Sequence, residues 1–354
     1  MKFIHTADVH LFATPDAEFE WGENRTKEIE ETFEVIIDDC NKKDIDLLLI
    51  AGNLFDRSPS VEDLIFVDDK LMRLEKTRTV ILLGCDDYIT PGSESEAYKF
   101  RSRTVMLPPE KTTNAYLRGI NTCVTGYSYG KPQYRERILE QIDPGRKDAI
   151  NILIGHGGDN DHMPFRKEKL AAKGYDYVAM GYIRKPLHIL KNRMAYAGSP
   201  EPLGPKETGR HGYVIGEITS EGTEIEWCPI ARRNYVDISI TMKPELDGRE
   251  VVNKLDEKMM KLGNENIYRI IFRGFANRDI DFDLTRIHER YNIYEIVNMT
   301  ISSEDEKMLR VENETNMMGS FIREISEAYT VNEGVRSKAL RYGMEALIMA
   351  GEKE

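Results

Sequence analysis

Polar residues that can bind ions or move protons follow several apolar runs of this sequence. Asp8 and His10 follow the first run, and His156 ends another run far along the chain. Because the carboxyl ends of parallel strands meet at one edge of a sheet, residues from distant strand ends can gather there. Carboxylate and imidazole groups are common metal ligands, so the pattern indicates a metal or ligand site. An Asp-x-His pair taken alone is not specific for one.

The elements that must position these residues alternate between strands and helices. A strand is expected from Lys2, a helix over 25–41, and a strand over 46–52, where a continuous apolar run closed by glycine is typical of burial on both faces. A second helix over about 61–75 and a strand over 79–84 repeat the pattern. This order predicts an α/β sheet with the site at its strand ends. Further strands of the same layer are expected at 121–127, 149–155, 177–181, 194–198 and 213–218.

The chain is long enough for more than one domain. Its 354 residues correspond to two or three domains at roughly 100–200 residues each. Residues 1–230 form the first predicted domain, and 231–305 read as a compact α+β module. Residues 306–354 read as two amphipathic helices. In the module we expect strands over 235–242, 267–273 and 293–301 and helices over 248–262 and 282–290.

Composition and charge exclude several classes of protein. Hydrophobic residues make up 40% and charged residues 31% of the chain, which excludes disordered and collagen-like proteins. No apolar stretch reaches the ~18 residues of a membrane span, so we expect no membrane association and a cytoplasmic location. The four cysteines form no CxxC pair, which argues against a zinc ribbon or a disulfide framework. The net charge of −12 is unlike that of an autonomous nucleic-acid binder.

Six motifs, in order and with matching spacers, resemble the calcineurin-like metallophosphoesterases. Within that superfamily the chain is most similar to the DNA double-strand-break repair exonucleases of the SbcD type. The resemblance implies a four-layer β-sandwich flanked by helices, a small α+β capping domain and C-terminal helices. It also implies hydrolysis of DNA phosphodiesters with Mn²⁺ or Mg²⁺. The motifs are His5–Leu11 (Asp-x-His), Ile50–Asp56 (Gly-Asp-x-x-Asp in the family), Leu83–Asp87 (Gly-Asn-His-Asp), Leu153–Gly157, Gly174–Pro186 (Gly-His-x-His) and Tyr196–Leu203.

Several metal-binding positions of the family carry other residues here. Asn53 stands in place of an aspartate that bridges two metals, and Asp86 in place of the catalytic histidine. Tyr182 and Arg184 replace both histidines of the fifth motif. By the resemblance, the candidate metal positions are Asp8, His10, Asn53, Cys85 and His156, and the doubtful catalytic position is Asp86.

These replacements change the electrostatics of the predicted site. A carboxylate near a cation contributes about 4 kcal/mol at 4 Å and an effective dielectric of 20, and the neutral Asn53 cannot supply that. Arg184 carries a permanent positive charge and is never a ligand at neutral pH. Asp86 lacks an imidazole whose pKa suits proton transfer. The sequence therefore predicts weak or absent catalysis.

Two other interpretations of the site stay open. Cys85, Asp86 and Asp87 are anionic or soft groups that could help to hold one metal, with His162 as a further ligand. Alternatively, Arg184 forms a salt bridge with Asp8 or Asp86 and holds the loops together where metals are bound in the family.

The predicted function is that of a catalytically weakened or inactive SbcD-like subunit, which binds DNA and acts as the architectural partner of an SbcC-like coiled-coil ATPase. The alternatives are an active Mn-dependent exonuclease with a rearranged site and a phosphodiesterase for small substrates. A homodimer is also possible on this resemblance. The C-terminal helices would bind the ATPase, unless their apolar stripes bury each other. The candidate partner-binding residues are Phe321, Ile325, Leu340, Met344 and Leu347.

Overall fold

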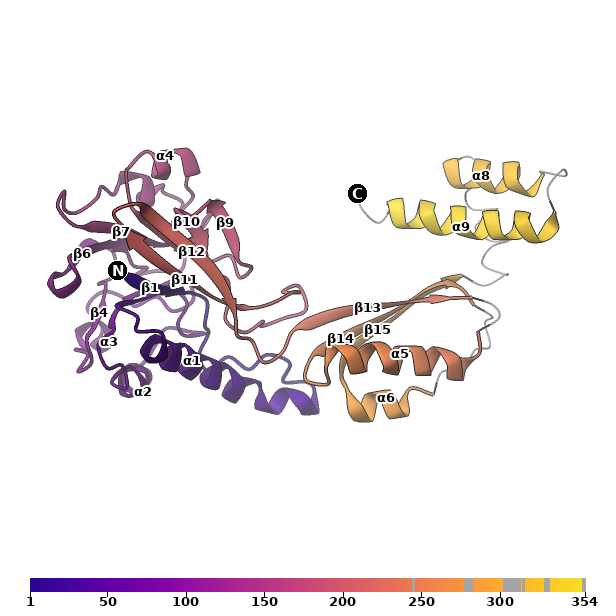
Figure 1. Cartoon of the computed structure of the whole chain (residues 1–354), viewed down its shortest axis with the longest axis horizontal. Coiled ribbons are helices and arrows are strands. Elements are labelled where there is room, and N and C mark those ends of the chain that lie inside the picture. Colours follow the sequence, from indigo (N-terminus) through magenta and orange to yellow (C-terminus); the bar gives the residue numbers. More distant parts are fainter. Residues whose placement is uncertain (244–245, 277–282, 302–312, 314–315, 328–331, 352–354) are drawn as a thin grey trace. The chain divides into compact units, whose positions relative to one another are not determined.

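Two six-stranded sheets face each other in the first of two units, Met1–Tyr235 and Val236–Glu354, of this computed structural model (Figure 1). The structure describes residues 1–243, 246–276, 283–301, 313, 316–327 and 332–351. The predicted α/β class, with two sheets flanked by helices, is confirmed for the first unit.

The first sheet runs in the order β12-β11-β1-β2-β3-β4. The strands β1 to β4 are parallel, whereas β11 and β12 are antiparallel additions beside β1. The parallel register places the carboxyl ends of β1, β2 and β3 at one edge. The bounds are β1 Lys2–Thr6, β2 Leu47–Ala51, β3 Arg78–Leu82, β4 Thr104–Met106, β11 Gly212–Thr219 and β12 Gly222–Pro229.

The second sheet runs in the order β5-β6-β7-β8-β10-β9. Its central strands are parallel, and β5 and β9 are antiparallel edges. The expectation that all strands share one layer is therefore wrong: a run buried on both faces has the same pattern whichever sheet it joins. The bounds are β5 Thr112–Leu117, β6 Thr122–Tyr127, β7 Ile150–His156, β8 Tyr177–Gly181, β9 Leu187–Leu190 and β10 Met194–Tyr196.

Helices cover the outer face of the first sheet. In α1 (Arg25–Lys42), Ile29, Phe33 and Ile36 recur at helical spacing and are buried against side chains of the sheet. Ser60 caps α2 (Val61–Leu71) in a capping box with Asp63. Short helices α3 (Glu94–Ala97) and α4 (Lys167–Ala171) and the 3₁₀ turns Glu20–Asn24, Arg118–Ile120 and Ile138–Gln141 complete the unit.

A separate core fills the space between the two sheets. Phe3, Leu49 and Val80 of the first sheet pack there against Ile152 and Ala179 of the second. All five side chains are fully buried, with 0% of their surface exposed to solvent. The strand ends are therefore held at fixed positions by packing on both faces of the first sheet.

The second unit contains a three-stranded sheet, β13-β14-β15, and four described helices. Side chains of the sheet and of α5 share one core, with Ile240, Leu255 and Phe272 among its members. Two further helices pair with each other. The bounds are β13 Tyr235–Met242, α5 Gly248–Leu262, β14 Ile267–Phe275, α6 Thr285–Arg290, β15 Asn292–Ile301, α8 Met317–Ser326 and α9 Glu333–Gly351.

The residues that link the two units are bound to the first one. The Arg233 guanidinium donates hydrogen bonds from both Nε and Nη2 to the Glu28 carboxylate. The Tyr235 hydroxyl donates to Asp16 Oδ1 at 2.6 Å. The predicted boundary after residue 230 and the separate helical segment after 305 stay predictions. None of the helices in the described ranges is both long and apolar enough to span a membrane.

Candidate functional site

The loops after β1, β2 and β3 bring Asp8, Asn53 and Asp86 together. The Asn53 Nδ2 lies 3.3 Å from Asp8 Oδ1 and 3.0 Å from Asp86 Oδ2. The backbone N–H of Asp86 donates to Asn53 Oδ1 at 3.0 Å, which fixes which end of the carboxamide is which. The NH₂ group therefore faces the two carboxylates, and the oxygen faces away from them.

Unusual backbone angles are concentrated in these loops. Asp8, His10 and Asn53 have φ values of 51°, 51° and 50°, and Tyr182 has 102°. Aspartate and asparagine tolerate the left-handed region, but a tyrosine there is strained. The Tyr182 N–H donates to Asp8 Oδ2 at 2.9 Å and so holds this conformation. Strain of this kind is typical of functional sites.

His10 and His156 are both buried, but their ring nitrogens are used differently. His10 Nδ1 lies 2.9 Å from Asp56 Oδ1, while Nε2 has no hydrogen-bond partner in the described structure and lies 4.0 Å from Asp8 Oδ1. His156 Nδ1 donates to the Ala51 carbonyl at 2.9 Å, since a carbonyl can only accept. Its Nε2 lies 3.6 Å from the Cys85 sulfur.

Cys85 is a thiol rather than a thiolate. Burial and the neighbouring Asp86 carboxylate raise the pKa of Cys85 to about 12. The thiol lies 3.6 Å from His156 Nε2 and 3.7 Å from Asp86 Oδ1, and both are acceptors within its reach. Cys85 and His156 are therefore neighbours within sulfur hydrogen-bond distance, and Cys85 is a neutral thiol near neutral pH in this structure.

Tyr182 forms a cluster with Asp159 and His162. Its hydroxyl donates to Asp159 and lies 3.0 Å from His162 Nδ1, and its ring stacks on that of His162. Burial alone would raise the pKa of Asp159, but hydrogen bonds from Tyr182 and His162 lower it to about 2. His162 therefore uses Nδ1 within this cluster. Sequence reasoning missed Asp159, because no motif contains it.

Arg184 forms an ion pair, but not with the predicted partners. Its Nη1 lies 3.0 Å from Glu207 Oε1. Burial alone would lower the pKa of the Arg184 guanidinium. The negative charges of Glu207, Asp8 and Asp86 outweigh this effect, so the pKa of Arg184 is raised overall. The predicted contact ion pair with Asp8 or Asp86 is therefore replaced by one with Glu207, a loop residue outside the motifs, and the two site carboxylates act on Arg184 from a longer distance.

Asp87 is a structural carboxylate. It is fully buried and accepts hydrogen bonds from the backbone N–H groups of Asn53, Gly84, Leu54 and Phe55, at 3.1, 2.5, 2.7 and 3.3 Å. Burial raises the pKa of Asp87, and these bonds oppose the rise. Both oxygens are used, so the prediction that Asp87 helps to hold a metal does not fit its surroundings.

A model of calcineurin-like phosphoesterases matches residues 1–181, about half of the chain. The chain belongs to the calcineurin-like phosphoesterase family. Members of the family use divalent metals, which can be tested against the residues present here. Among the described residues, no three His, Cys, Asp or Glu side chains converge closely enough to hold a metal ion. With the Asn53 NH₂ aimed at Asp8 and Asp86, the donor set does not fit the family's ions.

Two relatives of this chain are informative. The uncharacterized metallophosphoesterase YhaO of Bacillus subtilis is 27% identical over 78% of this chain and 72% of its own length. The DNA double-strand break repair protein Mre11 of Methanopyrus kandleri is 26% identical over 64% of this chain. The match covers 57% of that Mre11. These similarities support the family and leave the finer subfamily open.

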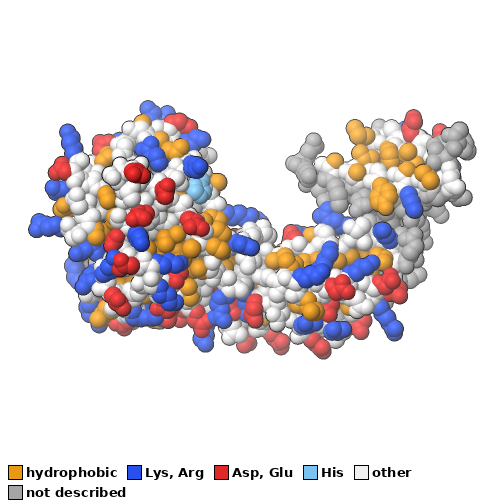
Figure 2. All heavy atoms as spheres, in the orientation of Figure 1, with side chains coloured by type: hydrophobic (Ala, Val, Ile, Leu, Met, Phe, Trp, Pro, Cys, Tyr) orange, Lys and Arg blue, Asp and Glu red, His pale blue; other side chains and the backbone are white. Residues whose placement is uncertain are grey.

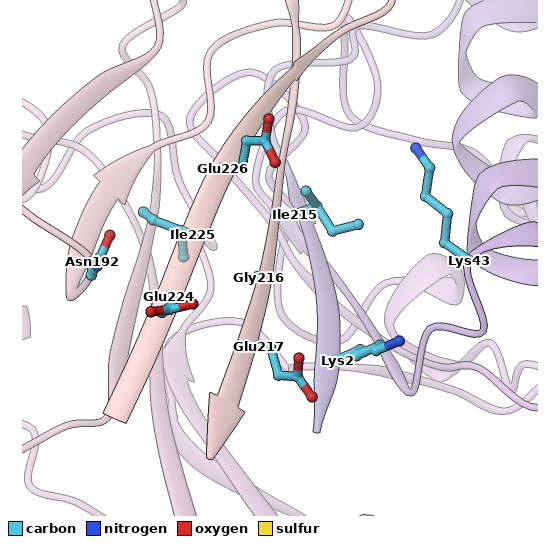
Figure 3. A pocket seen from close by; sticks show the side chains of 9 residues that line it. All are labelled: Lys2, Lys43, Asn192, Ile215, Gly216, Glu217, Glu224, Ile225 and Glu226. Carbon is cyan, nitrogen blue, oxygen red and sulfur yellow. The ribbon is translucent and has the colours of Figure 1, made fainter. Parts of the chain in front are cut away.

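One cavity in the described part of the chain lies away from these residues. It has a volume of about 500 Å³ and is lined by Glu217, Glu224 and Glu226 on β11 and β12 and by Lys2 and Lys43 (Figure 3). No predicted site residue lines it. The chemistry-bearing residues therefore sit in a closely packed cluster of loops, while this cavity is formed on the outer face of the first sheet.

The predicted partner-binding residues contact each other. Phe321, Ile325, Leu340 and Met344 belong to one apolar cluster between α8 and α9, and Leu347 is half-buried. This is the arrangement in which the two stripes bury each other. A partner would therefore have to use the outer face of the hairpin or open it.

Proposed function

We propose that this chain is an SbcD-like subunit of a DNA-break repair complex that binds DNA and a coiled-coil ATPase but does not hydrolyse phosphodiesters. The similarity to a protein named for DNA double-strand break repair supports the role, and the six motifs support the subfamily. The same proposal includes that the protein is soluble, is not associated with a membrane and is located in the cytoplasm.

The observation that carries the loss of hydrolysis is the guanidinium of Arg184. It occupies the last position of the fifth motif and is held by Glu207 at 3.0 Å. The cation lies close enough to Asp8 and Asp86 for their charges to raise the pKa of Arg184. A divalent ion beside these carboxylates would be repelled by the Arg184 guanidinium, because like charges repel and the pair is partly screened from water.

The hairpin of α8 and α9 supports the partner role through its outer face. Hydrophobic side chains gather on this hairpin (Figure 2), and Met317, Val335 and Tyr342 are 76%, 57% and 62% exposed. Exposed apolar side chains that lie together on a helical surface are typical of surfaces that pack against other proteins. The partner surface that we propose is therefore the outer face of the hairpin. The residues Phe321, Ile325, Leu340 and Met344 support this surface from inside.

A nuclease assay tests the loss of hydrolysis. End-labelled duplex DNA is incubated with the chain and Mn²⁺, and bis-p-nitrophenyl phosphate serves as a small substrate. We expect no turnover of either substrate beyond that of the Asp8→Ala variant, which controls for contaminating nucleases. DNA turnover that Asp8→Ala abolishes would establish the active exonuclease instead. Turnover of the small ester alone would establish the phosphodiesterase.

Binding is measured separately from hydrolysis. Gel-shift titration with duplex DNA tests the nucleic-acid role, and it should be repeated at several salt concentrations because phosphate contacts are salt-dependent. Light scattering of the purified chain tests the homodimer. Absence of any DNA binding, alone and with the ATPase, would contradict the proposed role even if hydrolysis is also absent.

A further inference from the structure

The loops at this site are joined by hydrogen bonds at the place where the family uses ions. Asn53 is 2% exposed, and its carboxamide contacts the loops after β1 and β3 while belonging to the loop after β2. Gly84 closes the other side, because a Cβ there would lie 2.3 Å from Asn53 Oδ1. The carboxamide is therefore enclosed by all three loops.

We propose that the Asn53 carboxamide is a metal-independent hub that holds the loops after β1, β2 and β3 together, and that Asn53→Asp makes their stability depend on a divalent cation. The inference goes beyond the proposed function, since it concerns what stabilises the fold rather than which substrate is bound. It holds or fails whether or not the chain binds DNA.

The two carboxylates at the hub face hydrogen-bond donors and lie near a cation. Asp8 and Asp86 each face a hydrogen of the Asn53 NH₂ group, so both carboxylates meet partial positive charge. The Arg184 guanidinium adds a full positive charge in the same region, as the influence of Asp8 and Asp86 on it indicates. The amide and the nearby guanidinium therefore reduce the repulsion between the two carboxylates.

Asn53→Asp changes one group of this set and keeps its shape. The NH₂ becomes an oxygen, so two hydrogen bonds become contacts between carboxylates at about the same separations of 3.3 and 3.0 Å. Aspartate tolerates the left-handed φ of 50° about as well as asparagine, so the backbone conformation is not the variable under test. A cation between three carboxylates relieves their repulsion, and oxygen ligands are those that Mn²⁺ accepts.

Thermal unfolding of the full chain tests the proposal, with Mn²⁺ and EDTA as the two conditions. We expect the wild type to unfold at the same temperature in both. Asn53→Asp should unfold several degrees lower in EDTA and recover in Mn²⁺. Asn121→Asp is the matched control, because Asn121 has a left-handed φ of 45° and its amide donates to a backbone carbonyl. This control should not respond to Mn²⁺.

A double variant keeps the test decisive if Asn53→Asp fails to fold. Asn53→Asp with Asp86→Asn restores two carboxylates and one amide, so it should fold in EDTA and ignore Mn²⁺. Stabilisation of the wild type by Mn²⁺ would overturn the proposal. An Asn53→Asp variant that is as stable in EDTA as the wild type would overturn it too, as would a double variant that unfolds like Asn53→Asp alone.

Discussion

The Arg184 guanidinium and the Glu207 carboxylate form an ion pair at 3.0 Å that anchors the fifth motif to a loop 23 residues further along the chain. Glu207 also accepts from Ser199 Oγ at 3.3 Å and from the Leu203 N–H at 3.0 Å. One carboxylate thus connects Arg184 of the fifth motif to Ser199 and Leu203 of the sixth.

Replacement of Arg184 by alanine should destabilise the chain by about 1–3 kcal/mol, because Glu207 would lose its charged partner while remaining 12% exposed. The double variant with Glu207→Gln should recover part of the loss. Urea unfolding of the two single variants and the double variant measures the coupling. Additive effects of the two substitutions would contradict the pairing, and the exposed neighbour Lys185→Ala serves as a control.

Arg25 is an arginine whose charged side chain is fully buried. It is 0% exposed, and its Nη1 lies 2.9 Å from Glu28 and 3.5 Å from Glu201. Arg25→Met should cost about 3–5 kcal/mol, because it leaves buried carboxylates uncompensated. Lys27→Met should cost less than about 1 kcal/mol, since Lys27 pairs with Glu31 in solvent. Equal shifts of the urea midpoint for both variants would show that the Arg25 network is not stabilising.

His5 should make the stability of the first unit depend on pH. It is fully buried, and burial lowers its pKa from 6.5 to about 3, against a smaller opposing effect of the Met180 backbone. Below pH 6.5 the unfolded chain binds a proton that the folded chain does not, so this contribution to stability falls with pH until about 3. The slope is about 1.4 kcal/mol per pH unit for one group.

The measurement is the difference in unfolding free energy between wild type and His5→Gln at successive pH values. The variant should lack this part of the slope, so the difference between the two proteins narrows or reverses as the pH falls. His188→Gln, at an exposed position on β9, should leave the slope unchanged. A His5→Gln slope equal to that of the wild type would show that His5 is not the group responsible.

The helical hairpin offers a prediction about partner binding. Met344 is 0% exposed between α8 and α9, whereas Tyr342 is 62% exposed on the outer face. Met344→Ala should destabilise the hairpin by about 2–5 kcal/mol. Tyr342→Ala should weaken the pull-down of a coiled-coil ATPase and leave the helix content unchanged by circular dichroism. If Tyr342→Ala binds normally and Met344→Ala binds more tightly, the partner inserts between the helices instead.

The sequence predicts the interior strands better than the edges of the sheets. Every strand that the sequence predicts in the first unit lies between two other strands of its sheet. The four strands that it does not predict are the edges of the two sheets, namely β4, β5, β9 and β12. An edge strand is half in solvent, so it lacks the continuous apolar run that marks a buried one. In β12, glutamates alternate with Ile225 and Trp227, which is the period of a half-buried strand and is missed when only continuous apolar runs are taken as strands.

The motifs identify which residues meet but not what each one binds. The order of strand ends predicts that Asp8, Asn53 and Asp86 are neighbours, and they are within hydrogen-bond distance. The partners Glu207 and Asp159 come from irregular loops, and nothing in their local sequence sets the loop conformation. The orientation of the Asn53 amide depends on the Asp86 N–H, a contact that only the folded backbone creates.

Asp87 has a consequence for motion on the timescale of hydrogen exchange. The amide protons of Asn53, Leu54, Phe55 and Gly84 all end on its two oxygens. These protons can exchange with deuterated solvent only after their hydrogen bonds to the Asp87 carboxylate break. The four amides should therefore exchange at one common rate. The loops after β2 and β3 thus open as a single cooperative body, and the slowest of their fluctuations is set by one side chain.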